Sequence, residues 1–140
     1  MERWILYAII SMLFAGFTSV IAKFGLKNVS GDTGLAVRTV FVFLFVWTTV
    51  LLFQPLKEFT KLTIKDVGFL AISAFTTTVS WIFYYRAMKE GEVSMVASID
   101  KASIVVTILL SFLLLKEPVT AKLLTGAGFI LVGLMILVWK

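Results

Sequence analysis

Residues 93–115 read VSMVASIDKASIVVTILLSFLLL, an apolar run in which Asp100 and Lys101 are the charged residues. A helix that crosses the hydrocarbon core of a membrane needs about 20 mostly apolar residues, so this stretch is long enough to span one. A charged side chain near the membrane centre costs at least about 2.5 kcal/mol on insertion scales. The stretch therefore predicts a membrane helix in which the adjacent acid and base have a structural or functional role that offsets the cost of placing them there.

The composition of the whole chain is that of an integral membrane protein. Of its 140 residues, 60% are hydrophobic and 15% are charged, whereas soluble domains have about 25% charged residues. Cysteine and histidine are absent, which excludes disulfides, thiol chemistry and histidine-based catalysis and leaves few zinc sites. We expect no metal and no cofactor. The basic residues are scattered along the chain, so no nucleic-acid partner is expected.

Four further segments have the length and hydropathy of membrane helices. The expected spans cover residues 4–26, 34–53, 66–88, 93–115 and 119–139. Residues 54–65 form the longest connection, and Pro118 suits the first turn of the last helix. The sequence therefore predicts one all-α domain over residues 1–140, a bundle of five transmembrane helices in a multi-pass membrane protein.

Positive charge does not select an orientation for these spans. With an odd number of spans, the two ends of the chain lie on opposite faces. Lys and Arg divide six to six between the faces when residues at span ends are counted, and six to three in favour of the N-terminal face when they are not. The rule that positive loops stay in the cytoplasm leaves two interpretations. One is a single orientation set by Lys57, Lys61 and Lys65; the other is insertion in both orientations, followed by antiparallel pairing.

Several motifs resemble those of a known family. They are YYRAMKEG at 84–91, SIDK at 98–101, LLLKE at 113–117, and Thr120 followed by Gly126, Gly128 and Gly133. Over essentially the whole chain they resemble the EamA-type repeat of the drug/metabolite transporter superfamily. Members of that superfamily typically carry two such repeats, inverted relative to each other, in a ten-helix unit. Residues 100–102 stand where the family usually has a proline.

The resemblance implies secondary transport of small metabolites, amino acids or drugs. A chain with one repeat would be one half of the ten-helix inverted-repeat architecture, so the expected partner is a second copy, in a homodimer that is antiparallel if both orientations insert. Membrane lipids and the small-molecule solute are the other expected partners. The expected location is the cytoplasmic membrane of a prokaryote.

Helical periodicity gathers polar residues into stripes on the third and fourth spans. The stripes contain Ser73, Thr77, Ser80 and Tyr84 in one helix and Asp100, Ser103, Thr107 and Ser111 in the other. Polar residues inside a membrane usually face a bundle interior or a water-filled space, so these stripes are interpreted as cavity lining. The alternative is helix packing, in which each interhelix hydrogen bond adds about 0.6 kcal/mol. For Gly126, Gly128 and Gly133 of the last span we favour helix or dimer packing.

The third span also carries Trp81, Tyr84 and Tyr85 near its end. These rings could stack on a planar or cationic ligand. Core packing or anchoring at the membrane interface is the equally weighted alternative for Tyr85.

Asp100 lies about 11 Å into its span at 1.5 Å per residue. Lys101 can extend toward the surface, but the short Asp100 side chain needs a partner, a proton or water. Lys23, Arg38 and Arg86 fall in the same half of the membrane. If they face inward, they form a positive vestibule for an anionic substrate with Asp100 as its counter-ion. Alternatively, they reach to the surface and the Asp100–Lys101 pair locks helices together.

The predicted function is secondary transport of a small, anionic or amino-acid-like solute by alternating access in a dimer. The residues predicted to bind substrate or proton are Asp100, Lys101, Arg86, Tyr84, Ser80, Thr77, Ser103 and Thr107, with Lys23 and Arg38 in the vestibule. The rival is a non-transporting membrane subunit or a lipid-handling helper. An enzyme is not expected, because one deep carboxylate without histidine or cysteine does not supply acid–base chemistry.

Overall fold

Long apolar runs form helices throughout residues 2–139, which the computed structural model describes. The α-helices are α1 (Arg3–Gly25), α2 (Gly31–Phe53), α3 (Ile64–Glu90), α4 (Val93–Asp100), α5 (Ser103–Leu110) and α6 (Ala121–Val138). A 3₁₀ segment, η1 (Leu56–Lys61), connects α2 to α3, and a π-helical segment, η2 (Ser111–Leu115), follows α5. Within the described residues, five stretches are long and apolar enough to cross a membrane, which confirms the predicted all-α fold with five membrane-spanning segments.

Local capping explains where three of the helices begin. The Ser30 hydroxyl accepts the Thr33 N–H at 3.1 Å, so α2 starts earlier than the hydropathy suggests. Thr63 and Asp66 form a reciprocal capping box at the start of α3, with N–H to oxygen distances of 2.9 and 3.3 Å. Thr120 caps α6, so Pro118 precedes this helix. The prediction that Pro118 occupies the first turn of the helix is therefore wrong.

The fourth span is not one continuous α-helix. It runs from Val93 to Leu115 as α4, α5 and η2 in succession. Between α4 and α5 the amides bond three residues back: Lys101 N–H to Ser98 at 3.1 Å and Ala102 N–H to Ile99 at 3.0 Å. Such bonds characterise an overwound 3₁₀ turn, and this turn follows Asp100 directly.

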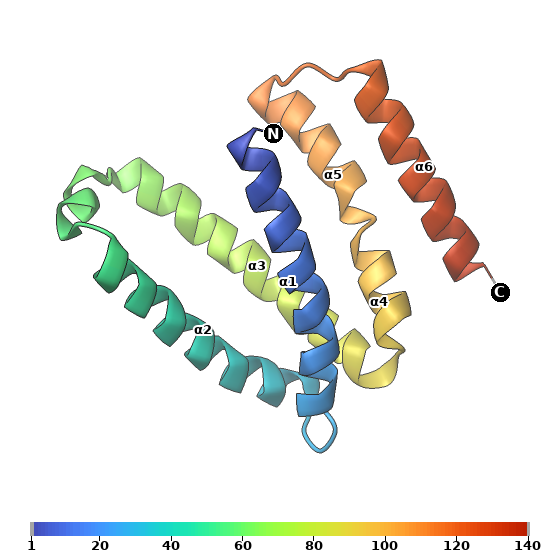
Figure 1. Ribbon diagram of the computed structural model, residues 1–140, viewed down its shortest axis with the longest axis horizontal. Coiled ribbons are helices and arrows are strands. Elements are labelled where there is room, and N and C mark those ends of the chain that lie inside the picture. The colour runs from blue at the N-terminus through green and yellow to red at the C-terminus, as the bar shows by residue number, and fades with distance from the viewer. Residues whose placement is uncertain (1, 140) are drawn as a thin grey trace. The chain divides into compact units, whose positions relative to one another are not determined.

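The chain divides into two compact units, one ending at Glu90 and the other beginning at Gly91. In the first, α2 and α3 form a hairpin through η1, and the start of α2 meets the end of α3 beside the last turns of α1 (Figure 1). Gly31 makes this approach possible, because a Cβ there would lie 2.8 Å from the Tyr85 carbonyl carbon. The buried apolar side chains Leu26, Leu35, Tyr85 and Met88 gather at this end.

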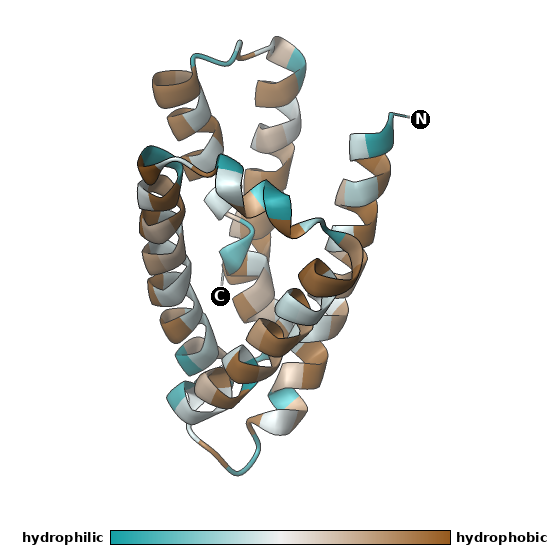
Figure 2. Cartoon of the chain, turned by 90° about the vertical axis from the view of Figure 1, so that its left-hand side faces the viewer, coloured by the Kyte–Doolittle hydropathy of each residue, from teal (hydrophilic) through white to brown (hydrophobic). Residues whose placement is uncertain are grey.

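In the second unit, α6 runs back alongside the preceding segments (Figure 1) and contacts α4. Ala127 is its buried apolar residue among those described. In both units, apolar residues follow the helices along their length, and polar residues concentrate at helix ends and connections (Figure 2). Most large apolar side chains are exposed on the chain taken alone, as expected where lipid or another protein covers the helices.

Candidate functional site

Arg86, a predicted binding residue, forms a two-pronged ion pair with Asp32. Its Nε and Nη2 donate to the two carboxylate oxygens at 2.8 and 2.7 Å. Both side chains are about half exposed. The pair joins the last turns of α3 to the first turn of α2. The sequence did not predict Asp32 as the partner of Arg86.

Two lysines cap the ends of each other's helices. Lys23 on α1 donates to the Met88 carbonyl at 2.5 Å, and Lys89 on α3 donates to the carbonyl of Leu26 at 2.7 Å. The last carbonyls of a helix have no partner within it, and lysine also complements the negative end of the helix dipole. Lys23 therefore has a structural contact at the place where the sequence predicts a vestibule cation.

The predicted polar stripe of α3 contacts α1 at one end and is exposed further along the helix. The Tyr84 and Ser19 hydroxyls lie 2.8 Å apart and connect α3 to α1. Thr77 donates to the carbonyl of Ser73 in its own helix at 2.9 Å. Ser80 and Thr77 are exposed on the chain taken alone. Their predicted contact with solute stays a prediction.

Arg38 differs from the other cations of the first unit. Its guanidinium lies over the Trp81 ring, 4.5 Å from the centroid, and 5.8 Å from the Tyr85 centroid. Among the described residues it has no carboxylate partner. Two of the three aromatic rings that could stack on a cationic ligand, Trp81 and Tyr85, therefore lie beside a cation of the protein itself.

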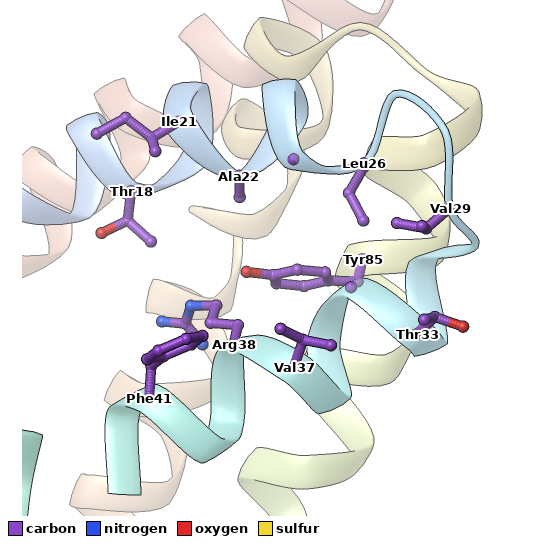
Figure 3. A pocket seen from close by; sticks show the side chains of 12 residues that line it. Thr18, Ile21, Ala22, Leu26, Val29, Thr33, Val37, Arg38, Phe41 and Tyr85 are labelled. Carbon is purple, nitrogen blue, oxygen red and sulfur yellow. The ribbon is translucent and has the colours of Figure 1, made fainter. Parts of the chain in front are cut away.

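Next to Arg38 lies a cavity of about 680 Å³, lined mainly by apolar side chains of α1 and α2, among them Ile21, Val37 and Phe41. Figure 3 shows the Tyr85 ring crossing between the two helices, with its hydroxyl end toward the Arg38 guanidinium. The hydroxyl is buried and has no hydrogen-bond partner among the described residues. A buried polar group left in this state costs about 1–3 kcal/mol.

The sequence identified the parts of this site but not their combination. Arg38 was predicted to line a vestibule and Tyr85 was considered as an aromatic wall, whereas the unpaired hydroxyl has no sequence signal. The two residues lie far apart in the chain, and helical periodicity relates residues only within one helix.

The second unit holds the adjacent acid and base. Lys101 Nζ lies 3.6 Å from Asp100 Oδ2, and their side chains are 65% and 40% exposed. On α5, Thr107 donates to the carbonyl of Ser103 at 3.1 Å. The expected approach of Asp100 to Lys23, Arg38 and Arg86 stays a prediction, as do the binding roles of Lys101, Ser103 and Thr107.

The glycines of α6 face open space. A Cβ built on Gly126, Gly128 or Gly133 would meet no described atom within 4 Å. They are therefore not at close helix contacts of the chain taken alone, and their predicted contact with a second copy is a proposal.

Comparison with known proteins covers nearly the whole chain. The model of the EamA-like transporter family matches residues 2–139. A protein of Sinorhizobium sp named "Uncharacterized transporter in cobO 3'region" is 31% identical over 136 residues, which are 97% of this chain and 96% of that protein. No solved structure gives a significant match.

Proposed function

Because the chain belongs to the EamA-like transporter family, as its motifs suggest, we propose that it carries a small solute across the membrane by alternating access. A role in transport follows from the family, and the five apolar spans make the chain an integral membrane protein. The family is one of transporters, which favours a carrier over an enzyme. The bacterial relative supports a place in the cytoplasmic membrane of a prokaryote.

The observation that carries the proposed mechanism is the break in the fourth span. The overwound turn at residues 101–102 directly follows Asp100, the one acidic residue of that span. A 3₁₀ stretch in mid-helix often marks a hinge, and broken helices border the binding sites of many transporters. We therefore assign Asp100 to the coupling proton or the solute and the turn to the motion that opens the site alternately to each side.

The working unit in this proposal is a homodimer. One chain supplies five spans, and a second copy in the opposite orientation would supply the inverted partner that many transporters encode in a single chain. The glycines of α6, where a Cβ would meet no described atom within 4 Å, offer a close-packing face for such a contact.

A second candidate is a non-transporting subunit that assembles with another membrane protein. The contacts of Arg86 with Asp32 and of Lys23 with Met88 favour it, because they occupy two predicted vestibule cations in holding helices together.

Transport in proteoliposomes tests the proposal. Purified protein is reconstituted, a pH gradient is imposed, and uptake of a panel of radiolabelled amino acids and organic carboxylates is measured. We expect Asp100→Asn to abolish gradient-driven uptake while the variant still inserts. Glu117→Gln, which neutralises a carboxylate outside the span, is the matched control and should transport normally. Uptake no greater than in protein-free liposomes would favour the non-transporting subunit, and normal uptake by Asp100→Asn would remove this residue from the mechanism.

A further inference from the structure

The cavity between α1 and α2 combines three features of a ligand-binding site, and the proposed mechanism at Asp100 assigns it no role. It is apolar over most of its lining, its size of about 680 Å³ falls within the range of small-molecule sites, and Arg38 and Tyr85 bring polar atoms to it (Figure 3). All of its lining residues belong to the first unit.

Arg38 supplies an unneutralised cation. The neighbouring cations of α1 and α3 have partners: Arg86 holds Asp32, Lys23 holds the Met88 carbonyl and Lys89 the Leu26 carbonyl. Arg38 instead lies over the Trp81 ring, with its guanidinium carbon 4.5 Å from the centroid. A contact with a ring provides no hydrogen-bond acceptor for the guanidinium N–H groups, and these groups match a carboxylate or phosphate in a two-pronged geometry.

Tyr85 supplies a hydroxyl that lacks a partner. The residue is 4% exposed, and its oxygen has no hydrogen bond within the described chain. A phenol can donate to an anion. The hydroxyl end of Tyr85 points toward the Arg38 guanidinium (Figure 3), so an anion held by Arg38 would lie near it.

We propose that this cavity binds an amphipathic anion, with the apolar body between α1 and α2 and the anionic group on Arg38, assisted by the Tyr85 hydroxyl. A cation is repelled by Arg38, and a neutral molecule gains the apolar contacts without the charge-assisted hydrogen bonds. The site names the solute class of the proposed transport, and it depends on that proposal only for the claim that the bound anion is carried across the membrane.

Three probes with one apolar body test the charge requirement. Radiolabelled 3-phenylpropionate, 3-phenylpropanol and 3-phenylpropylamine are bound to the full-length protein in phosphatidylcholine nanodiscs by equilibrium dialysis. The anion should bind about tenfold more tightly than the alcohol, since hydrogen bonds to charged groups add this much, and the amine should bind more weakly still. Equal binding of the three probes, or no binding of the anion, would overturn the inference.

Four variants test the residues. Arg38→Gln should weaken binding of 3-phenylpropionate about tenfold or more, and Tyr85→Phe about fivefold. Arg3→Gln and Tyr7→Phe change the same residue types at exposed positions on α1 and should bind as the unmodified chain does. Tyr85→Phe keeps the buried ring, so weaker binding without a loss of thermal stability separates binding from folding. If Arg38→Gln binds 3-phenylpropionate as tightly as the unmodified chain does, the anion does not bind at this site.

An anionic lipid also combines an apolar body with an anionic group. A second experiment distinguishes a lipid occupant from a solute. Nanodiscs containing phosphatidylglycerol are analysed by native mass spectrometry. Retained phosphatidylglycerol that displaces 3-phenylpropionate and is lost in Arg38→Gln supports the site with lipid as its occupant. Flux of 3-phenylpropionate into proteoliposomes supports the solute. Failed flux with intact binding counts against the proposed transport of this anion alone, whereas absent binding of 3-phenylpropionate counts against the site alone.

Discussion

Gly31 shows how one residue sets the geometry around the cavity. It is buried where the start of α2 meets the end of α3, and a methyl group there would lie 2.8 Å from the Tyr85 carbonyl carbon and oxygen and 2.9 Å from the Arg86 nitrogen. These are backbone atoms, which cannot turn aside as a side chain can. The close approach places Tyr85 in the lining of the cavity and brings Arg86 within reach of Asp32.

Gly31→Ala should therefore destabilise the protein. Overpacking of this kind costs about 1–3 kcal/mol, which exceeds the gain of at most about 1 kcal/mol when alanine replaces glycine in a helix. The measurement is the thermal unfolding of the purified protein in detergent, where a lower midpoint is expected. Gly68→Ala on α3 is the control, because a Cβ there meets nothing within 4 Å. A midpoint that stays equal in both variants would show that α2 and α3 part easily at this contact.

The sequence predicts at the residue scale which side chains are unusual, but not which of them have partners. Lys23, Arg38 and Arg86 stand out because cations are rare in apolar runs. Arg86 and Asp32 are separated by many residues, and Lys23 bonds to a backbone carbonyl that any residue could have supplied. Only the folded chain separates the paired cations from Arg38.

At the scale of elements, the long helices could be predicted because each needs about 20 apolar residues whatever it packs against. The division of the fourth span could not. Asp100 and Lys101 mark the position, yet the same residues are compatible with a continuous helix, and the overwound turn appears only in the bonds of Lys101 and Ala102. The first residues of α2 and α6 depend on single capping hydroxyl groups, so these helices begin at other residues than the hydropathy predicts.

The break predicts a local difference in hydrogen exchange. Amides in 3₁₀ turns have poorer hydrogen-bond geometry, and the proposed mechanism requires water or solute at Asp100. Peptides covering residues 99–105 should therefore exchange faster than peptides covering residues 123–131 of α6, measured by mass spectrometry in nanodiscs. Replacing Asp100 and Lys101 together by alanine, the strongest helix former, should slow exchange at the break. If the break exchanges as slowly as α6 in the unmodified chain, then it is dry and the proposed path does not pass through it.

At the scale of the whole molecule, the proposed antiparallel dimer requires insertion in both orientations, and the balance of positive charge allows it. With span ends counted, six Lys and Arg residues belong to each face, and a small change in this balance should select one orientation. An antiparallel dimer needs both. Lys57 and Lys61 lie on η1, exposed and away from the cavity, so they can be changed without affecting it.

Lys57→Gln combined with Lys61→Gln leaves four positive residues on the N-terminal face against six on the other. The face with more positive charge stays in the cytoplasm, so the C-terminus should move there in a larger share of molecules. A fluorescent protein that folds only in the cytoplasm and a phosphatase active only outside it, each fused to the C-terminus, measure the two populations. Both reporters should be active on the unmodified chain, and Lys57→Arg with Lys61→Arg should keep that ratio. A single active reporter that the double Gln variant does not shift would establish one orientation, and the dimer would then have to be parallel.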